Sequence, residues 1–261
     1  MRVAFQGEAG AYSEQALFNY FGNVETLPCE SFDLVFDSVA TGKSDSGLIP
    51  IENSLAGSIH QNYDLLAKNN LYIVGETVLR VRHCLIAMPD VKKEEIKKAI
   101  SHPQALAQCA EYLRSHNIKP EPVYDTAGSV KMLKESGARD TAAIASKRAA
   151  EIYGMQILEE GIEDSEKNFT RFLAISTEPT VPKGEAKTSL MFESQSLYQV
   201  LNLFAESNLK LTKIESRPLQ GKPWEYIFFV DVLGLMNELM FKQLGDYATN
   251  IKVLGSYPKF G

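Results

Sequence analysis

An arginine inside an otherwise apolar run is the strongest chemical signal in this sequence. Arg171 follows Phe169 and Thr170 and precedes the apolar residues 172–175, and the run has the length and composition of a β-strand. Burying a guanidinium group without a partner is costly, so Arg171 requires an anion or a carboxylate nearby. Thr170 adds a neutral hydroxyl group, which can donate or accept a hydrogen bond. Together the two residues predict the floor of a site for a small carboxylic acid.

Small and hydroxyl-bearing residues recur where expected strands end and helices begin. A helix N-terminus attracts anions through its free N–H groups and its dipole, although ordinary capping explains any single case. Several such junctions in one domain favour a shared ligand crevice, because the carboxyl ends of strands cluster at one edge of an α/β sheet. The junctions are residues 7–13, 52–58, 101–104, 125–129 and 145–148.

The sequence supports neither a metal site nor covalent catalysis. His60, His83, His102 and His116 lack the H-x-x-x-H and H-E-x-x-H spacings of metal ligands. No G-x-S-x-G motif, dinucleotide fingerprint or P-loop occurs. His102 alone occupies a capping position, beside Gln104, where a role in the site and a role as a cap are equally expected. We therefore expect no metal and no cofactor.

The apolar periodicity predicts the elements that must position these residues. Up to about residue 176, short apolar runs alternate with segments of helical period, which is typical of an α/β sheet. A helix is expected after Ser31, because Phe32, Val35, Phe36 and Val39 would share one face. The expected strands are residues 3–5, 46–51, 71–77, 82–88, 141–145 and 172–175.

The pattern also predicts how the chain divides. Residues 78–81 join two strand regions without a turn signal, as a strand crossing between two lobes would, and the run around Arg171 would return to the first lobe. Residues 177–185 have two prolines, a glycine and no apolar period, which indicates a linker. Beyond them the predicted order is βαββαβ, a ferredoxin-like sandwich.

Composition excludes several classes of partner. The net charge of −6 comes without a basic stripe, which argues against nucleic-acid binding. No run approaches the roughly 20 apolar residues of a membrane span, and the N-terminus lacks a signal-peptide pattern. Cys29, Cys84 and Cys109 lie far apart, which disfavours a disulfide framework. We expect a cytoplasmic protein without a nucleic-acid or membrane partner.

Specific motifs recur along nearly the whole chain. They are residues 10–13 (GAYS), 50–54 (PIENS), 57–59 (GSI), 101–106 (SHPQAL), 124–129 (YDTAGS), 168–172 (NFTRF), 213–218 (KIESRP) and 254–258 (LGSYP). In combination they closely resemble the monofunctional prephenate dehydratases and the related arogenate dehydratases. The last two motifs resemble the ACT regulatory domain of these enzymes.

The resemblance implies a fold and a reaction. The fold is α/β, with a two-lobed catalytic domain similar to periplasmic binding proteins and a C-terminal βαββαβ ACT domain. The implied segments are a catalytic domain 1–177, with lobes of about 1–78 plus 162–177 and of 79–161, a linker 178–186, and an ACT domain 187–261. The implied reaction converts prephenate to phenylpyruvate, water and carbon dioxide in L-phenylalanine biosynthesis, without a cofactor.

The resemblance also implies site residues. Thr170 is the implied catalytic residue and would donate a hydrogen bond to the departing hydroxyl group, while Arg171 would hold a substrate carboxylate. Further implied substrate contacts are Phe172, Asn53, Ser54, Ser101, His102, Gln104, Thr126 and Ser146.

Regulation by L-phenylalanine and assembly into a homodimer or homotetramer are implied by the ACT resemblance. The implied effector contacts are Glu215, Ser216, Arg217, Pro218 and Leu197. The chain departs from the family just before Leu197, where the turn is shorter and Gln195 occupies the place of a glycine. A side chain there blocks the close backbone approach that glycine permits, so loss of phenylalanine binding and a change of ligand both stay open.

Two other functions stay open at this point. Arogenate differs from prephenate by an amino group in place of a keto group, and nothing in the sequence reads that difference. A non-catalytic amino-acid sensor is the second alternative. The presence of Thr170 beside the arginine favours an enzyme, because a sensor would not require it.

Overall fold

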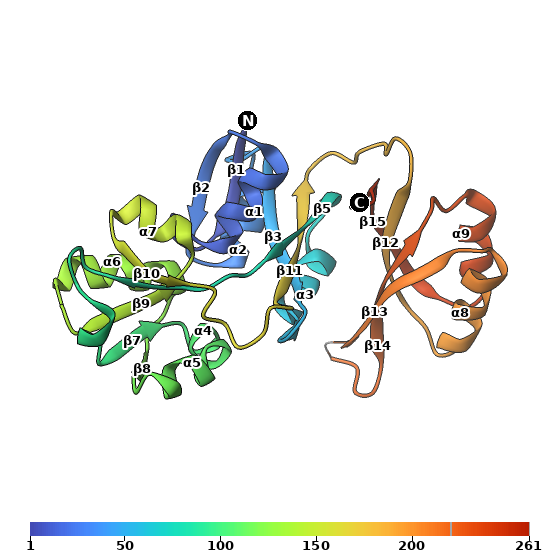
Figure 1. Cartoon of the computed structure of the whole chain (residues 1–261). Coiled ribbons are helices and arrows are strands. Elements are labelled where there is room, and N and C mark those ends of the chain that lie inside the picture. Colours follow the sequence, from blue (N-terminus) through green and yellow to red (C-terminus); the bar gives the residue numbers. More distant parts are fainter. Residues whose placement is uncertain (220, 261) are drawn as a thin grey trace.

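Three β-sheets, each with its own helices, follow one another across the molecule (Figure 1). The computed structural model describes residues 1–219 and 221–260, so Gln220 and Gly261 lie outside the described residues. The first two sheets form two lobes of an N-terminal domain, and the third belongs to a C-terminal domain. The expected fold class is confirmed, because two α/β lobes are followed by a βαββαβ domain.

The first lobe is built on a sheet with the strand order β2-β1-β3-β11-β5, and β4 pairs with β3. The strands are β1 (Arg2–Gln6), β2 (Glu25–Cys29), β3 (Ser46–Asn53), β4 (Gly57–Ser58), β5 (Tyr72–Arg80) and β11 (Phe169–Ser176). The helices are α1 (Tyr12–Phe21), α2 (Phe32–Ala40) and α3 (His60–Lys68). The expected helix after Ser31 is α2, which buries Val35, Phe36 and Val39 and whose N-cap Ser31 accepts a hydrogen bond from the Leu34 N–H.

The second lobe has the strand order β10-β6-β9-β7-β8. The strands are β6 (Cys84–Ala87), β7 (Lys98–Ser101), β8 (Lys119–Pro122), β9 (Thr141–Ala145) and β10 (Gln156–Glu160). The helices are η1 (Lys93–Glu95), α4 (Pro103–Gln108), α5 (Ala110–Ser115), α6 (Thr126–Ser136) and α7 (Lys147–Tyr153). Within the described ranges, no helix of the chain is both long and apolar enough to cross a membrane.

Two segments cross between the lobes and run side by side. The first leads from β5 to β6, and the second leads from β10 back to β11. The Val81 N–H donates to the Asn168 carbonyl at 2.8 Å, and the Gly161 N–H donates to the His83 carbonyl at 2.8 Å. The boundary expected at residue 78 falls inside β5, which continues to Arg80.

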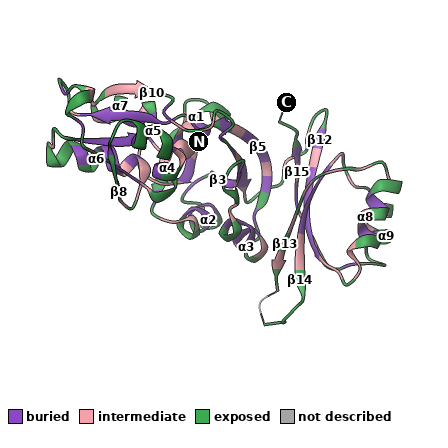
Figure 2. Ribbon diagram, turned by 60° about the horizontal axis from the view of Figure 1, so that its bottom comes forward, coloured by how far each residue is buried: buried purple, intermediate pink, exposed green. Residues whose placement is uncertain are grey.

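The C-terminal domain is a four-stranded antiparallel sheet with the order β13-β14-β12-β15. Its elements are β12 (Ala186–Glu193), α8 (Leu197–Glu206), β13 (Lys210–Pro218), β14 (Tyr226–Leu233), α9 (Glu238–Leu244) and β15 (Thr249–Pro258). Both helices cover the outer face of the sheet (Figure 2). Leu190 and Val230 pack under the helices, whereas the neighbouring Met191 and Phe229 join a core cluster of the first lobe. The sheet therefore buries both faces, one of them against the N-terminal domain.

Strand β15 approaches β5 at backbone distance. A Cβ atom added at Gly255 would lie 2.0 Å from the carbonyl oxygen of Ile73. Nearby, the Lys252 ammonium donates to the carbonyl oxygen of Asn69 at 2.6 Å. The C-terminal domain is thus fixed closely to the back of the first lobe.

We expect Gly255→Ala to lower the free energy of unfolding by about 1–3 kcal/mol, because the new methyl group forces the two strands apart. Urea denaturation checks this. Lys259→Ala, at an exposed position just beyond the same strand, should stay within about 0.5 kcal/mol of the wild type. An unchanged stability of Gly255→Ala would contradict the close contact of β15 with β5.

Candidate active site

A cavity of about 170 Å³ is lined by residues of both lobes and of the segments that join them. It collects strand ends and helix starts, as the junctions in the sequence predicted. The lining residues are Tyr12, Ser13, Pro50, Asn53, Ile59, Val81, His83, His102, Gln104, Ala105, Gln108, Thr126, Thr170 and Phe172. We refer to this cavity as the cleft.

A continuous chain of hydrogen bonds runs along one side of the cleft. The Tyr12 hydroxyl lies 2.9 Å from His83 Nδ1, and His83 Nε2 lies 2.9 Å from Gln108 Oε1. Asn168 Nδ2 donates to the same Gln108 oxygen at 3.0 Å. Asn53 Nδ2 then donates to Asn168 Oδ1 at 2.8 Å. The chain ends at Thr170, whose hydroxyl oxygen is 3.0 Å from Asn53 Nδ2.

The orientation of the Asn53 amide fixes the role of Thr170. Asn53 Oδ1 accepts hydrogen bonds from the N–H groups of Leu55 and Ala56, at 3.0 and 2.9 Å, so the other end of the amide must be the donor. Asn53 Nδ2 therefore donates to Thr170 Oγ1, which acts as an acceptor toward it. The hydrogen of the Thr170 hydroxyl is left to donate to a molecule in the cleft.

The same reasoning fixes the tautomer of His83. The oxygen of Gln108 accepts from Asn168, and it has no hydrogen to give, so His83 Nε2 must carry the proton. His83 Nδ1 is then an acceptor that faces the Tyr12 hydroxyl, whose single hydrogen is shared with the Arg82 carbonyl, also at 2.9 Å. Burial lowers the pKa of His83 below its usual value and outweighs the opposing effects of Gln108 and Glu163. His83 is thus a neutral link whose Nε2 donates to Gln108.

Five of the predicted N-terminal site residues meet in the cleft besides Thr170. They are Asn53, His102, Gln104, Thr126 and Phe172. His102 also caps α4, because its Nδ1 accepts from the Gln104 N–H at 3.2 Å. Both roles expected for this histidine are therefore compatible with its position.

Three predicted contacts lie elsewhere and hold the backbone instead. Ser101 is fully buried and donates to the carbonyl of Ile144 at 2.6 Å. Ser146 is buried and bridges the lobes through the carbonyl of Gly10. Ser54 donates to the carbonyl of Lys167 at 2.7 Å. None of the three serines lines the cleft, because each hydroxyl is turned to a backbone partner.

Sequence reasoning missed Tyr12, Ser13, His83, Gln108 and Asn168. Tyr12, Ser13 and Asn168 belong to motifs that were noted, but the apolar pattern gave no reason to select them. His83 was considered only as a metal ligand, and Gln108 lies at the end of a helix with no motif of its own.

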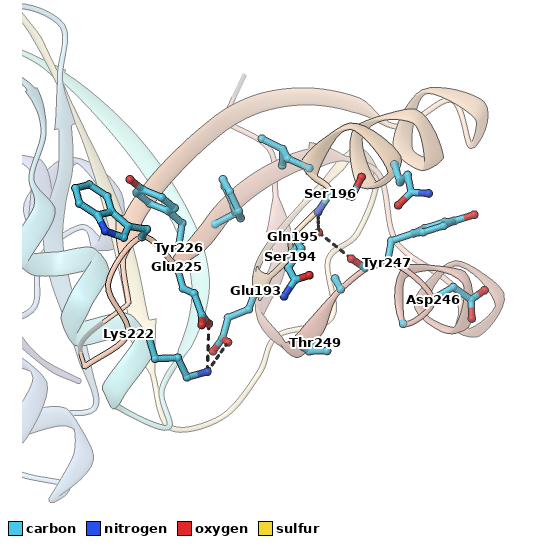
Figure 3. Close-up of a pocket in the computed structure, with 16 residues that line it drawn as sticks. Glu193, Ser194, Gln195, Ser196, Lys222, Glu225, Tyr226, Asp246, Tyr247 and Thr249 are labelled. Carbon is cyan, nitrogen blue, oxygen red and sulfur yellow. Dashed lines mark hydrogen bonds and ion pairs between the residues drawn. The ribbon is translucent and has the colours of Figure 1, made fainter.

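A second, larger hollow of about 970 Å³ lies on the C-terminal domain (Figure 3). Its lining comes from three segments and comprises residues 193–197, 199, 222, 224–226, 228 and 245–249. Gln195 and Leu197 are among the lining residues, and Lys222 lies between Glu193 and Glu225, at 3.7 and 3.4 Å. Of the expected effector contacts, Leu197 reaches this hollow, whereas Ser216 and Pro218 do not line it.

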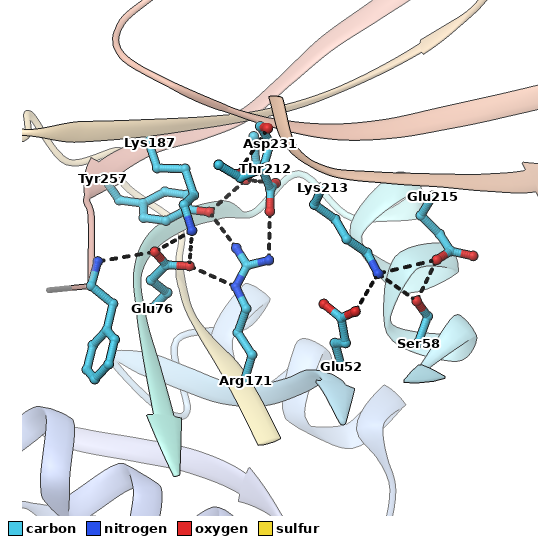
Figure 4. Close-up of polar contacts among 12 residues, drawn as sticks. Glu52, Ser58, Glu76, Arg171, Lys187, Thr212, Lys213, Glu215, Asp231 and Tyr257 are labelled. Atoms are coloured by element: carbon cyan, nitrogen blue, oxygen red, sulfur yellow. Dashed lines mark hydrogen bonds and ion pairs between the residues drawn. The ribbon is translucent and has the colours of Figure 1, made fainter. Parts of the chain in front are cut away.

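Glu215 and Arg217 are directed at the first lobe rather than at that hollow. Glu215 accepts a hydrogen bond from Ser58 at 2.5 Å (Figure 4). It also lies 3.3 Å from His60 Nε2. Arg217 pairs with Asp64 at 2.8 Å. The charged groups of both residues join the two domains in this structure, and their effector roles stay predictions.

The expected substrate contact of Arg171 is also corrected. Its guanidinium lies 2.8 Å from Glu76 and 2.7 Å from Asp231, on the side of β11 that faces the C-terminal domain (Figure 4). Burial alone would lower the pKa of Arg171, but Asp231, Tyr257 and Glu76 raise it. The physical reason is the alternation of side chains along a strand, which places Arg171 on the opposite face from Thr170. Arg171 therefore has the carboxylate partners that its burial requires, but these carboxylates belong to the protein and not to a substrate.

Metal binding has no support in the geometry. Among the residues that the structure describes, no group of three His, Cys, Asp or Glu side chains is placed to hold a metal ion. Cys84 and Cys109 are buried, and burial raises the pKa of Cys84 to about 11 and that of Cys109 further. Both thiols are poor nucleophiles in this state.

Comparisons with known proteins identify the family of the chain. Residues 3–180 match the family model described as prephenate dehydratase. Arogenate dehydratase 1 of Petunia hybrida is 44% identical over 283 residues, which cover 99% of this chain and 67% of the relative.

Two solved structures have nearly the same fold. A prephenate dehydratase from Arthrobacter aurescens, in complex with L-Phe, has a TM-score of 0.91 and 28% identity, with 99% of this chain and 90% of that chain covered. GqqA, described as a novel type of quorum quenching acylase, has a TM-score of 0.92 and 32% identity, with 100% and 98% covered. The chain belongs to the prephenate dehydratase family.

Proposed function

We propose that the protein is a carbon–oxygen lyase that converts prephenate to phenylpyruvate, water and carbon dioxide in L-phenylalanine biosynthesis. The observation that carries this proposal is the hydroxyl of Thr170, which Asn53 orients as a donor toward the cleft. Prephenate loses its ring hydroxyl and a carboxylate together, and formation of the aromatic ring drives the reaction. The catalyst therefore needs a hydrogen-bond donor at the departing oxygen and a site that holds the ring.

The remaining cleft residues fit the rest of the substrate. Phe172 offers an apolar surface to the ring. Ser13 and Thr126 lie in the first turns of α1 and α6, where hydroxyl and N–H donors suit a carboxylate. His102 adds a further polar group at the same cavity. These residues take over the carboxylate-binding role that the sequence assigned to Arg171.

An acyl-transfer reaction fits this cleft less well. A hydroxyl nucleophile needs a base that accepts its proton. Thr170 Oγ1 instead receives a hydrogen bond from Asn53 Nδ2, which withdraws electron density from the oxygen. The described part of the cleft lining therefore favours a Thr170 that donates a proton over one that attacks a carbonyl.

The lining also favours prephenate over arogenate. Arogenate carries an ammonium group, and a buried ammonium is stabilised by a carboxylate partner. The described residues that line the cleft include neither an aspartate nor a glutamate. The similarity to a Petunia arogenate dehydratase keeps arogenate as the alternative substrate.

Regulation and assembly are proposed on separate grounds. We propose an effector site for L-phenylalanine in the hollow that contains Leu197, and the Arthrobacter complex with L-Phe supports it.

We also propose a homodimer or homotetramer in the cytosol that associates through the C-terminal domain, where Tyr198, Trp224 and Leu239 are exposed. Calorimetric titration with phenylalanine and light scattering test these two proposals.

Turnover on the two substrates tests the reaction. We expect purified protein to form phenylpyruvate from prephenate, with kcat/KM at least about tenfold above the value for arogenate, because the cleft offers no carboxylate to an ammonium group. Phenylpyruvate formed from prephenate is measured by its absorbance in alkali. Phenylalanine formed from arogenate is measured by chromatography. Formation of neither product would leave the non-catalytic sensor as the better description.

Thr170→Val should reduce kcat by about 100- to 10,000-fold, because it removes the donor while keeping the shape of the side chain. Thr170→Ser keeps the hydroxyl and should retain most of the turnover. Circular dichroism and thermal melting confirm that both variants fold. Full activity of Thr170→Val would show that another group assists the departing hydroxyl.

Because His83 is buried in its neutral state, the stability of the folded protein should depend on pH. Its pKa in the folded protein lies below the ordinary value of about 6.5, so the unfolded chain binds more protons in the interval between the two values. The free energy of unfolding should therefore fall as the pH decreases from about 6.5 into that interval. His83→Gln should lack this contribution when urea denaturation is repeated at about pH 8, 6.5 and 5. Equal slopes for variant and wild type would contradict a buried, neutral His83.

A further inference from the structure

Two neighbouring residue pairs on β11 and β3 face opposite sides of the first sheet. Thr170 is in register with Asn53, and Arg171 is in register with Glu52. Thr170 and Asn53 line the cleft. Because side chains alternate along a strand, Arg171 and Glu52 emerge on the other face, where the C-terminal sheet lies.

The C-terminal sheet presents a matching pair of charges. Lys213 on β13 is in register with Asp231 on β14. Arg171 Nη1 lies 2.7 Å from Asp231 Oδ2, and Lys213 Nζ lies 2.9 Å from Glu52 Oε1 (Figure 4). Each sheet thus contributes one cation and one anion, and each ion pair joins the two domains. We call Glu52, Arg171, Lys213 and Asp231 the four-charge cluster.

The cluster is held in one arrangement by burial and by additional partners. The exposed fractions of the side chains are 15% for Arg171, 11% for Asp231 and 16% for Lys213, whereas Glu52 is 36% exposed. Asp231 also accepts a hydrogen bond from Ser189. A buried charge that loses its partner is strongly destabilised, so the C-terminal sheet cannot move without displacing Arg171 and Glu52 or leaving charges unpaired.

The strand pair that carries the catalytic residues is locally irregular. The register between β11 and β3 shifts between Arg171 and Phe172, where Phe172 lies opposite Pro50. Proline has no N–H group to donate to the ladder, and such bulges re-aim neighbouring side chains. Strand β5 pairs with residues 169–174 of β11 without a shift, so the irregularity affects the placement of Thr170 relative to Asn53 on the β3 side.

We propose that the four-charge cluster makes the C-terminal sheet a positioning element for Thr170 and Asn53. Arg171 and Glu52 act as positioning residues, because each is bonded along its strand to a residue of the hydrogen-bond chain in the cleft. The inference rests on the proposed function for its effect on turnover, but its structural part does not. Loss of the cluster should lower kcat rather than raise KM, because no residue of the cleft lining is replaced and a small misplacement of the donor slows the reaction.

Lys213→Gln tests the proposal with a matched control. We expect it to lower kcat by about tenfold with KM within about twofold of the wild type, and Lys213→Arg to restore most of the rate because it keeps the charge. Asp64→Asn is the control, because it breaks the pair with Arg217, which joins β13 to α3 and touches neither β3 nor β11. It should leave kcat within about twofold.

Hydrogen–deuterium exchange separates this inference from the proposed function. Lys213→Gln should accelerate exchange in peptides that cover residues 50–56 and 168–174, whereas Asp64→Asn should not. This readout holds even if wild-type protein turns over neither prephenate nor arogenate, an outcome that would refute only the proposed function. Equal exchange and equal kcat in Lys213→Gln and wild type, or equal effects of both variants, would overturn the positioning role.

Discussion

Strand β11 comes back from the second lobe and inserts antiparallel between β3 and β5 of the first sheet. This pairing closes the N-terminal domain, because the chain has left the first lobe at β5 and must return to it. It also brings one strand into contact with two different environments. Thr170 and Phe172 face the cleft, and Arg171 faces the C-terminal domain. The site, the junction of the lobes and the docking of the last domain all depend on this pairing.

Backbone N–H groups set the direction of the hydrogen bonds in the cleft. Each side chain of the hydrogen-bond chain then fixes the donor or acceptor role of the next one. The N–H groups of Leu55 and Ala56 orient Asn53, and Asn53 orients both Thr170 and Asn168. A buried polar group without a partner is costly, so reversal of one amide would leave several groups unsatisfied. The folded protein therefore holds the Thr170 hydroxyl in one hydrogen-bonding orientation before any substrate binds. The free energy needed to orient it is part of the free energy of folding.

Much of the fold was predictable, because apolar strands such as β3 and β11 and the amphipathic α2 have clear periodicity. Strands β2, β4, β7, β8 and β10 were not among the expected strands, and β8, for example, has the exposed sequence KPEP without an apolar period. The cleft positions of Thr170 and Phe172 were also predictable. Arg171 was misassigned although strand alternation already separates it from Thr170. Its partner Asp231 lies in another domain, and no local pattern in the sequence connects the two residues.

The route of the hydrogen-bond chain links the chemistry to the relative placement of the lobes. It starts at Tyr12 in the first lobe, passes through Gln108 in the second, and returns to Asn53 in the first. Gln108 lies at the end of α4 in the second lobe, and its hydrogen bond with Asn168 ties that lobe to the segment that returns to β11. The backbone of the first lobe sets the direction in which Thr170 donates, and the side chain of Gln108 brings the second lobe into the same chain of hydrogen bonds.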